Sequence, residues 1–149
     1  MTLIESSIKI EKPVEEVFKY ITNINLESMK KMSEYVTGVE VDGPLKLGTK
    51  YKVITTSFGH TNASNNEVIA YEENKLLSVK TYAPPPASDM VNTTILEADG
   101  SGTKMTAQMD AQLTVPGMPS MPGMEDMVKN QLLTGIQTTL AGYKKAIEG

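Results

Sequence analysis

Residues 124–148, MEDMVKNQLLTGIQTTLAGYKKAIE, form the longest stretch of the chain with a helical period. Apolar side chains recur there every three or four residues, which on a helix places them within roughly 120° of one another. They are Val128, Leu132, Ile136, Leu140, Tyr143 and Ile147. Glu125 and Asp126 near the start and Lys144 and Lys145 near the end suit the helix dipole. The pattern predicts a long helix that packs on an apolar surface.

The segment that leads into this helix is rich in methionine, proline and glycine. Residues 115–124 read VPGMPSMPGM, and Met118, Met121, Met124 and Met127 are four of the ten methionines in the chain. Pro122 suits a first-turn position of the helix. Flexible thioethers fill irregular core gaps, but they also suit surfaces that adapt to variable shapes. Both interpretations stay open: the methionines fill core, or they form the adjustable rim of a cavity.

The clearest strand pattern, residues 103–115, directly precedes the methionine-rich segment. Its odd positions are small or apolar and include Met105 and Met109, whereas its even positions are polar and include Asp110. Alternation with a period of two predicts a strand with one dry and one wet face. The dry face is the surface on which we expect the long helix to lie.

The remaining chain predicts one further strand before two short helices and five strands after them. The expected ranges are a strand at 3–11, a helix at 13–21, a second short helix capped by an Asx residue of the turn 22–25 and ending at about Met32, and strands at 35–41, 49–58, 61–73, 76–83 and 90–98. Short turns join most of the strands, so neighbours should pair antiparallel. We expect one α+β domain over residues 1–149, with a seven-stranded curved antiparallel sheet around the long helix.

Composition narrows the function classes. The 14 basic residues are all lysine, and with 18 acidic residues they give a net charge of −4. Only eight side chains are Tyr or Phe. Because nucleic-acid recognition relies on arginine and on aromatic stacking, nucleic acid is not an expected partner. The chain has no cysteine and one histidine, which argues against a transition-metal site, and no cofactor is expected. No apolar stretch approaches the ~20 residues of a membrane span, so we expect no integral membrane segment. We expect a cytoplasmic protein that is a monomer or a homodimer.

Two side chains are weak catalytic candidates. His60 follows Gly59 in an expected hairpin, where a histidine is usually solvated rather than paired with a substrate. Asp110 lies on the wet face of its strand and would act as an acid only if it entered a cavity. A structural interpretation is favoured for both residues.

The order of elements resembles the helix-grip fold of the START/Bet v 1-like (SRPBCC) superfamily, especially its bacterial polyketide cyclase/dehydrase-like branch. The resemblance spans nearly the whole chain and is carried by Ile8, Ile10, Pro13, Glu15, Val17, Phe18 and Ile21, by Gly43, Gly48 and Thr49, by Val68, Tyr71, Glu72, Leu76 and Leu77, by Gly100, Gly102 and Thr103, and by the last helix. Aromatase/cyclase members use a cavity arginine, which this chain lacks. The resemblance implies the fold more strongly than any chemistry.

The function implied by the resemblance is binding of a lipid- or polyketide-like small molecule between the sheet and the last helix. The predicted contacts are Met29, Tyr35, Tyr51, Val53, Thr55, Met105, Met109, Met121, Met124 and Val128. Two alternatives remain open. One is a polyketide cyclase/dehydrase-type enzyme that uses acid–base catalysis, and the other is a protein-interaction module like the Hsp90-activator relatives of the fold.

Overall fold

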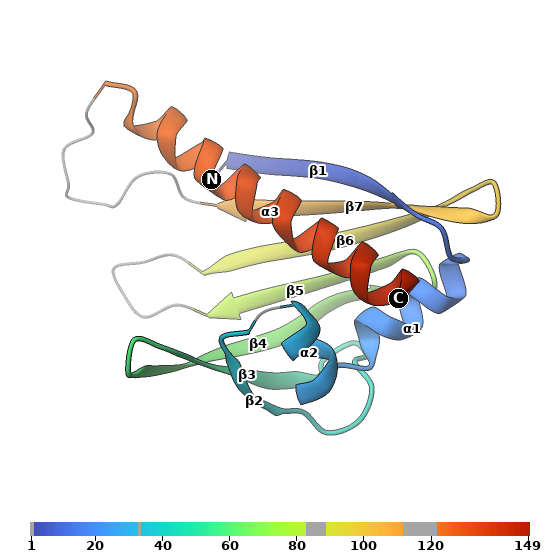
Figure 1. The fold of residues 1–149 in the computed structure, drawn as a ribbon, viewed down its shortest axis with the longest axis horizontal. Coiled ribbons are helices and arrows are strands. Elements are labelled where there is room, and N and C mark those ends of the chain that lie inside the picture. Colours follow the sequence, from blue (N-terminus) through green and yellow to red (C-terminus); the bar gives the residue numbers. More distant parts are fainter. Residues whose placement is uncertain (1, 33, 83–88, 112–121) are drawn as a thin grey trace.

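The computed structural model describes residues 2–32, 34–82, 89–111 and 122–149, and these form seven strands and three helices (Figure 1). Their bounds are β1 Thr2–Ile10, α1 Val14–Thr22, α2 Leu26–Met32, β2 Val36–Glu40, β3 Lys50–Ser57, β4 His60–Glu72, β5 Leu76–Tyr82, β6 Met90–Asp99, β7 Gly102–Ala111 and α3 Met124–Glu148. This arrangement confirms the predicted fold. The predicted end of the last strand, residues 112–115, lies outside the described residues.

All seven strands belong to one curved antiparallel sheet. Its order is β1-β7-β6-β5-β4-β3-β2, so β2 to β7 form a meander and β1 pairs with the last strand of that meander. Ile4 pairs with Met109, and Ile8 pairs with Met105. The alternation predicted for the last strand is confirmed at Met105, which is fully buried.

The helix starts follow from local chemistry. Asn25 caps α2, because its Oδ1 accepts from the Ser28 N–H at 2.8 Å while the Ser28 Oγ accepts from the Asn25 N–H at 3.0 Å. The first-turn position expected for Pro122 is wrong, since α3 begins two residues later at Met124. Gly123 stands before it with φ 81°, a left-handed conformation that turns the chain into the helix and that glycine adopts without strain.

Helix α3 crosses the inner face of the sheet along β1 (Figure 1). Helices α1 and α2 cover the same face near the C-terminal end of α3 (Figure 1). Ile136 and Leu140 are the buried residues of α3. The last turn of α3 is held to the end of β1 and to the β1–α1 connection. The Lys144 ammonium donates to the Lys9 carbonyl at 2.7 Å, and Glu148 Oε2 accepts from the Glu11 N–H at 3.0 Å. The apolar stripe predicted for this helix therefore does pack on the sheet.

A β-bulge in β4 determines which of its side chains point toward the helices. The pairing with β5 shifts between Val68 and Ala70, so both Val68 and Tyr71 point toward the core. The Tyr71 ring meets Phe18 of α1 edge-on, with centroids 5.3 Å apart. On the N-terminal side of the bulge, the alternate inward positions are Ser64 and Asn66.

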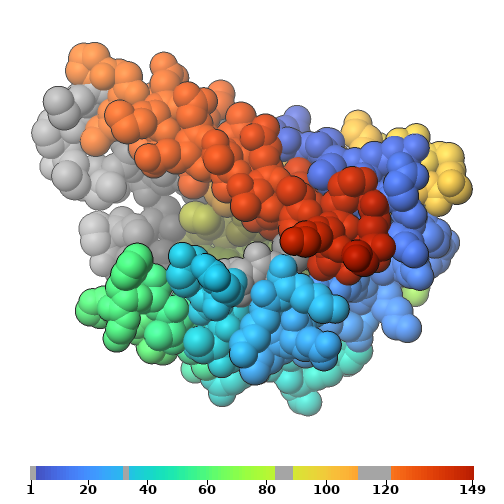
Figure 2. All heavy atoms as spheres, viewed as in Figure 1, coloured from blue at the N-terminus to red at the C-terminus, as the bar shows by residue number. Residues whose placement is uncertain are grey.

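The helices do not cover the inner face completely. The space-filling view shows a hollow between α3 and α2, at whose bottom the strands are visible (Figure 2). Within the part of the chain that the structure describes, no helix is both long enough and apolar enough to cross a bilayer.

Candidate ligand-binding cavity

A cavity of about 300 Å³ lies between the inner face of the sheet and the helical layer. Its apolar wall is formed by side chains of α1, α2, β3 and β5 and of the loops that follow α1 and β2. These residues are Ile21, Ile24, Met29, Leu45, Val53, Leu77 and Val79. Its polar wall comes from β3 to β6 and α3, through Tyr51, Ser64, Asn66, Thr81, Asn92, Thr94 and Tyr143. Because both layers contribute, the cavity can enclose a molecule from two sides.

Part of the polar wall is occupied by its own hydrogen bonds. The buried Asn66 amide donates to the Ser64 Oγ at 3.1 Å and to the Tyr51 carbonyl at 3.4 Å, and its Oδ1 accepts from the Thr81 hydroxyl at 2.7 Å. The Ser64 hydroxyl in turn donates to the Val53 carbonyl at 3.3 Å. This network joins the inner faces of β3, β4 and β5, so we interpret Asn66 as a structural residue of the wall.

The other polar side chains have no such partners. Among the described residues, the side chains of Asn92, Thr94, Tyr51 and Tyr143 form no hydrogen bond. Every described side-chain N or O atom that is fully shielded has a hydrogen-bond partner, so the polar atoms of these four residues remain in contact with open space. Since all four line the cavity, their hydrogen-bonding capacity is available to a ligand or to water.

The two tyrosines are the titratable groups in the described lining. Burial raises the pKa of Tyr51 strongly, and repulsion from an ionised Tyr143 raises it further. Burial also raises the pKa of Tyr143, with a smaller contribution from Tyr20, whose ring packs edge-on against it at 6.2 Å. Both hydroxyls are therefore protonated at neutral pH and act as hydrogen-bond donors.

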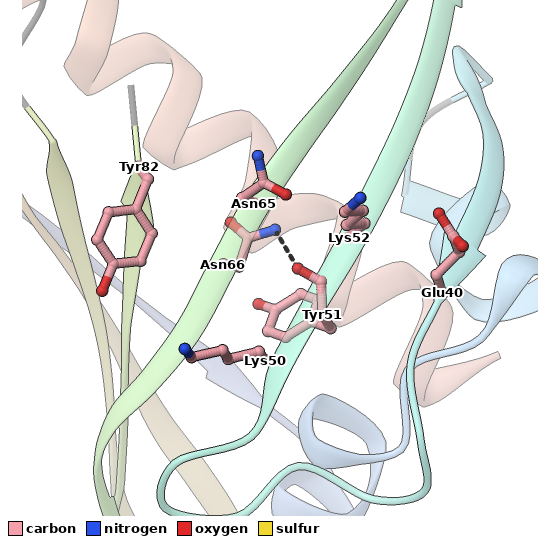
Figure 3. Close-up of a pocket in the computed structure, with 7 residues that line it drawn as sticks. All are labelled: Glu40, Lys50, Tyr51, Lys52, Asn65, Asn66 and Tyr82. Carbon is pink, nitrogen blue, oxygen red and sulfur yellow. Dashed lines mark hydrogen bonds between the residues drawn. The ribbon is translucent and has the colours of Figure 1, made fainter. Parts of the chain in front are cut away.

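A second hollow, which we name the outer hollow, has a volume of about 630 Å³, lies across β2 to β5 and shares two residues with the cavity (Figure 3). It is lined by Glu40, Lys50, Tyr51, Lys52, Asn65, Asn66 and Tyr82. Strand alternation places Lys50, Lys52 and Asn65 on the face opposite to Tyr51 and Asn66. Although it is larger, this hollow is lined by strands of one layer, and no described helix contributes to it. We therefore take the smaller, two-layered cavity as the candidate site.

Three of the predicted contacts line this cavity: Met29, Tyr51 and Val53. Thr55 lies two residues beyond Val53 on the same face of β3 and is not among the described lining residues. Tyr35 precedes β2 and is about half exposed, outside the cavity.

The predicted methionine-rich contacts lie elsewhere. Met105 is fully buried and Met109 packs against the core, both on β7 near β1. Met124 and Val128 are half-buried in the first two turns of α3, whereas the cavity reaches that helix at Tyr143, near its other end. Met121 lies outside the described residues.

Neither catalytic candidate reaches the cavity. His60 is exposed at the start of β4, next to the turn from β3. Asp110 pairs with Leu3 and Val91, and it points away from the face that Met109 occupies. The described residues also contain no group of three His, Asp or Glu side chains that could hold a metal ion.

The polar cavity lining from β4 and β6 was not predicted from the sequence. Asn66 and Asn92 lie in strands with polar residues on both faces, so alternation did not separate inside from outside. Tyr143 was assigned to the buried stripe of α3, but its hydroxyl was not recognised as a cavity group. One signal was available, because Asn, Thr and Ser recur at every second position of residues 62–66 and 92–94.

Fold and cavity together define a helix-grip protein of the START/Bet v 1-like class, with a mixed apolar and polar interior. The chain belongs to the family described as polyketide cyclase / dehydrase and lipid transport, whose model matches residues 1–148. No curated protein matches the chain by sequence.

Solved structures share the fold at low identity. The crystal structure of Ara h 8.0201 is 18% identical with a TM-score of 0.76, covering 99% of this chain and 97% of that one. A protein of unknown function from Staphylococcus aureus, SA2116, is 16% identical with a TM-score of 0.76, at 99% and 94% coverage. DynU16, from the dynemicin biosynthetic locus, is 16% identical with a TM-score of 0.66; the match covers 98% of this chain and 47% of DynU16.

Proposed function

We propose that this protein binds a hydrophobic small molecule of lipid- or polyketide-like character in the cavity between the sheet and the helices. The observation that carries the proposal is the two-layered cavity of about 300 Å³, half of whose lining residues are apolar. Ligand pockets commonly range from about 300 to 1,000 Å³, so the ligand is expected to be small. Membership of a family described by polyketide chemistry and lipid transport supports the same class of ligand.

Met29, Tyr51 and Val53 are the proposed contacts that already line the cavity. Met109 is adjacent to it, because its pairing partner on β6 is the lining residue Asn92. For Met124 and Val128, a role in binding would require a ligand that extends along α3 beyond the cavity.

Binding is favoured over acid–base catalysis because of the chemistry of the lining. Its described residues include no carboxyl, imidazole or amine group, and burial raises the pKa values of both tyrosines away from neutrality. A general base works best with a pKa near the operating pH, which none of these groups has. The interaction-module alternative is not favoured either, because no two of the exposed large hydrophobic residues among those described share an element or loop. They are Leu3, Leu26, Tyr35, Leu47, Phe58, Ile69, Tyr82 and Met127.

Native mass spectrometry of the protein purified from its own host tests this proposal. We expect the wild-type protein to retain a small apolar ligand, and the cavity-filling variant Val79→Phe to lose it. Val91→Phe is the matched control, because Val91 lies on the neighbouring strand but on the opposite face from the lining residue Asn92. Retention of the same ligand by folded Val79→Phe, or no ligand on wild-type protein even after incubation with host lipid extract, would contradict the proposal.

A further inference from the structure

The polar groups of the cavity divide into those that are satisfied by the protein and those that are not. Asn66, Ser64 and Thr81 bond to one another and to the backbone. The hydroxyls of Tyr51 and Tyr143, on β3 and α3, form no hydrogen bond with described residues, and both side chains line the cavity. Because these hydroxyls are in contact with the open space of the cavity, a ligand can bond to them in place of water.

We propose that the ligand is an uncharged molecule with a ketone, ester or similar acceptor oxygen that takes hydrogen bonds from Tyr51 and Tyr143, and that the cavity discriminates against carboxylates. This inference rests on the proposed function, because it specifies the ligand of the same cavity.

The two hydroxyls are suited to a neutral acceptor. Both are donors at neutral pH, and they approach the cavity from opposite layers, Tyr51 from the sheet and Tyr143 from the helix. Both side chains line one cavity of about 300 Å³, so a small ligand held there can contact the two phenol groups together. One carbonyl oxygen has two lone pairs and could accept from both.

The described lining disfavours an anion more strongly than a neutral molecule, because none of its residues carries a positive charge. The described lining has no lysine. The lysines next to lining residues of the strands and of α3 point elsewhere. Lys50, Lys52 and Lys80 lie on the opposite face of their strands from Tyr51, Val79 and Thr81. The Lys144 ammonium, next to Tyr143, bonds to Glu148 and to the Lys9 carbonyl. A carboxylate buried here would lose its hydration without gaining a counter-ion, which is costly in an apolar site.

A second pair of free polar groups lies on β6. Asn92 and Thr94 are two residues apart, so they share the inner face of that strand, and neither forms a side-chain hydrogen bond with described residues. An amide both donates and accepts, and so does a hydroxyl. The ligand is therefore expected to carry a second hydrogen-bonding group, separate from the acceptor at the tyrosines.

Three fluorescent probes that share one dimethylaminonaphthalene ring test the inference. The first carries a propionyl group, the second a propyl group and the third a carboxylate at the same ring position. We expect the ketone to bind about tenfold to a hundredfold more tightly than the propyl compound, because each of two neutral hydrogen bonds contributes about threefold to tenfold. We expect the carboxylate to bind at least about tenfold more weakly than the ketone.

Tyrosine variants test which side chains bond to the ketone oxygen. Tyr51→Phe and Tyr143→Phe should each weaken the ketone by about threefold to tenfold, leave the propyl compound unchanged, and shift ketone emission to the blue because hydrogen bonds to the carbonyl are lost. Tyr82→Phe is the matched control, since the Tyr82 hydroxyl bonds to Glu67 on the outer face. Sensitivity to Tyr82→Phe alone would place the probe in the outer hollow and overturn the inference.

The outcomes separate the two proposals. Equal affinity for all three probes, or tighter binding of the carboxylate, would overturn the inference while the proposed function stands. Failure of all three probes to bind would count against the proposed function and the inference together. A preference for the ketone that each tyrosine variant reduces would support both proposals.

Discussion

Replacing Asn66 by alanine tests whether the amide network holds the cavity wall together. The substitution removes the acceptor of the Thr81 hydroxyl and the donor to the Ser64 Oγ, bonds of 2.7 and 3.1 Å, at a side chain that is 7% exposed. Two neutral hydrogen bonds contribute about 1 kcal/mol each, and leaving a buried hydroxyl without a partner costs about 1 kcal/mol where water can enter. We expect Asn66→Ala to lower the free energy of unfolding by about 2–3 kcal/mol.

Urea denaturation followed by circular dichroism measures this loss. With a slope of about 2 kcal/mol per molar, the midpoint should fall by about 1–1.5 M. Asn65→Ala is the matched control, because Asn65 is the exposed neighbour on the opposite face and should change stability by less than about 0.5 kcal/mol. If Asn66→Ala unfolds within about 0.5 kcal/mol of the wild type, the network does not have the structural role assigned to it.

Three further predictions concern the core, a close backbone contact and the buried tyrosines. Leu140→Ala should lower the free energy of unfolding by about 3–4 kcal/mol in urea denaturation, because that side chain is 2% exposed where α3 meets the sheet. Gly102→Ala should cost more than about 1 kcal/mol in the same assay, since an added Cβ would lie 2.6 Å from the Ile10 carbonyl oxygen. The folded-state pKa values of Tyr51 and Tyr143 are raised, so their contribution is complete below the unfolded value of about 10 and is lost as pH rises above it. Unfolding at several pH values between about 9 and 11 should show stability falling more steeply for the wild type than for Tyr51→Phe.

Matched variants serve as controls for the predictions on Leu140 and Gly102. Met127→Ala, on the exposed first turn of α3, should change stability far less than Leu140→Ala. Gly135→Ala should stabilise by about 0.5–1 kcal/mol, because it lies within α3 with open space around it. Equal effects of the two alanine truncations, a neutral Gly102→Ala, or parallel pH profiles for wild type and Tyr51→Phe would contradict the respective assignments.

The fold was predictable from sequence because its signals are local. The stripe through Ile136 and Leu140 predicted a helix with one buried face, and both residues are buried. Alternation from Thr103 onward predicted which face of β7 points inward, as Met105 shows. The turn at residues 22–25 predicted an Asx cap for the second helix, and Asn25 is the residue that caps α2. Each of these features depends on residues within about one turn or one strand.

The cavity was less predictable because its position depends on long-range packing. The clustered methionines predicted ligand contacts at the start of α3, yet the described cavity meets that helix at Tyr143. The crossing of α3 over the sheet, the placement of α2, and the bulge after Val68 together decide where open space remains. Asn92 became recognisable as a cavity residue only when its neighbours on β5 and β7 were known.

The most direct test of the central claim is a crystal structure of the protein purified from its own host without removal of bound small molecules. We expect electron density for an apolar molecule between the sheet and the helices, in contact with Val53 and Val79 and with an oxygen near the Tyr51 and Tyr143 hydroxyls. A cavity filled only by protein side chains or water, or a ligand seated instead in the outer hollow beside Lys50, would contradict the account.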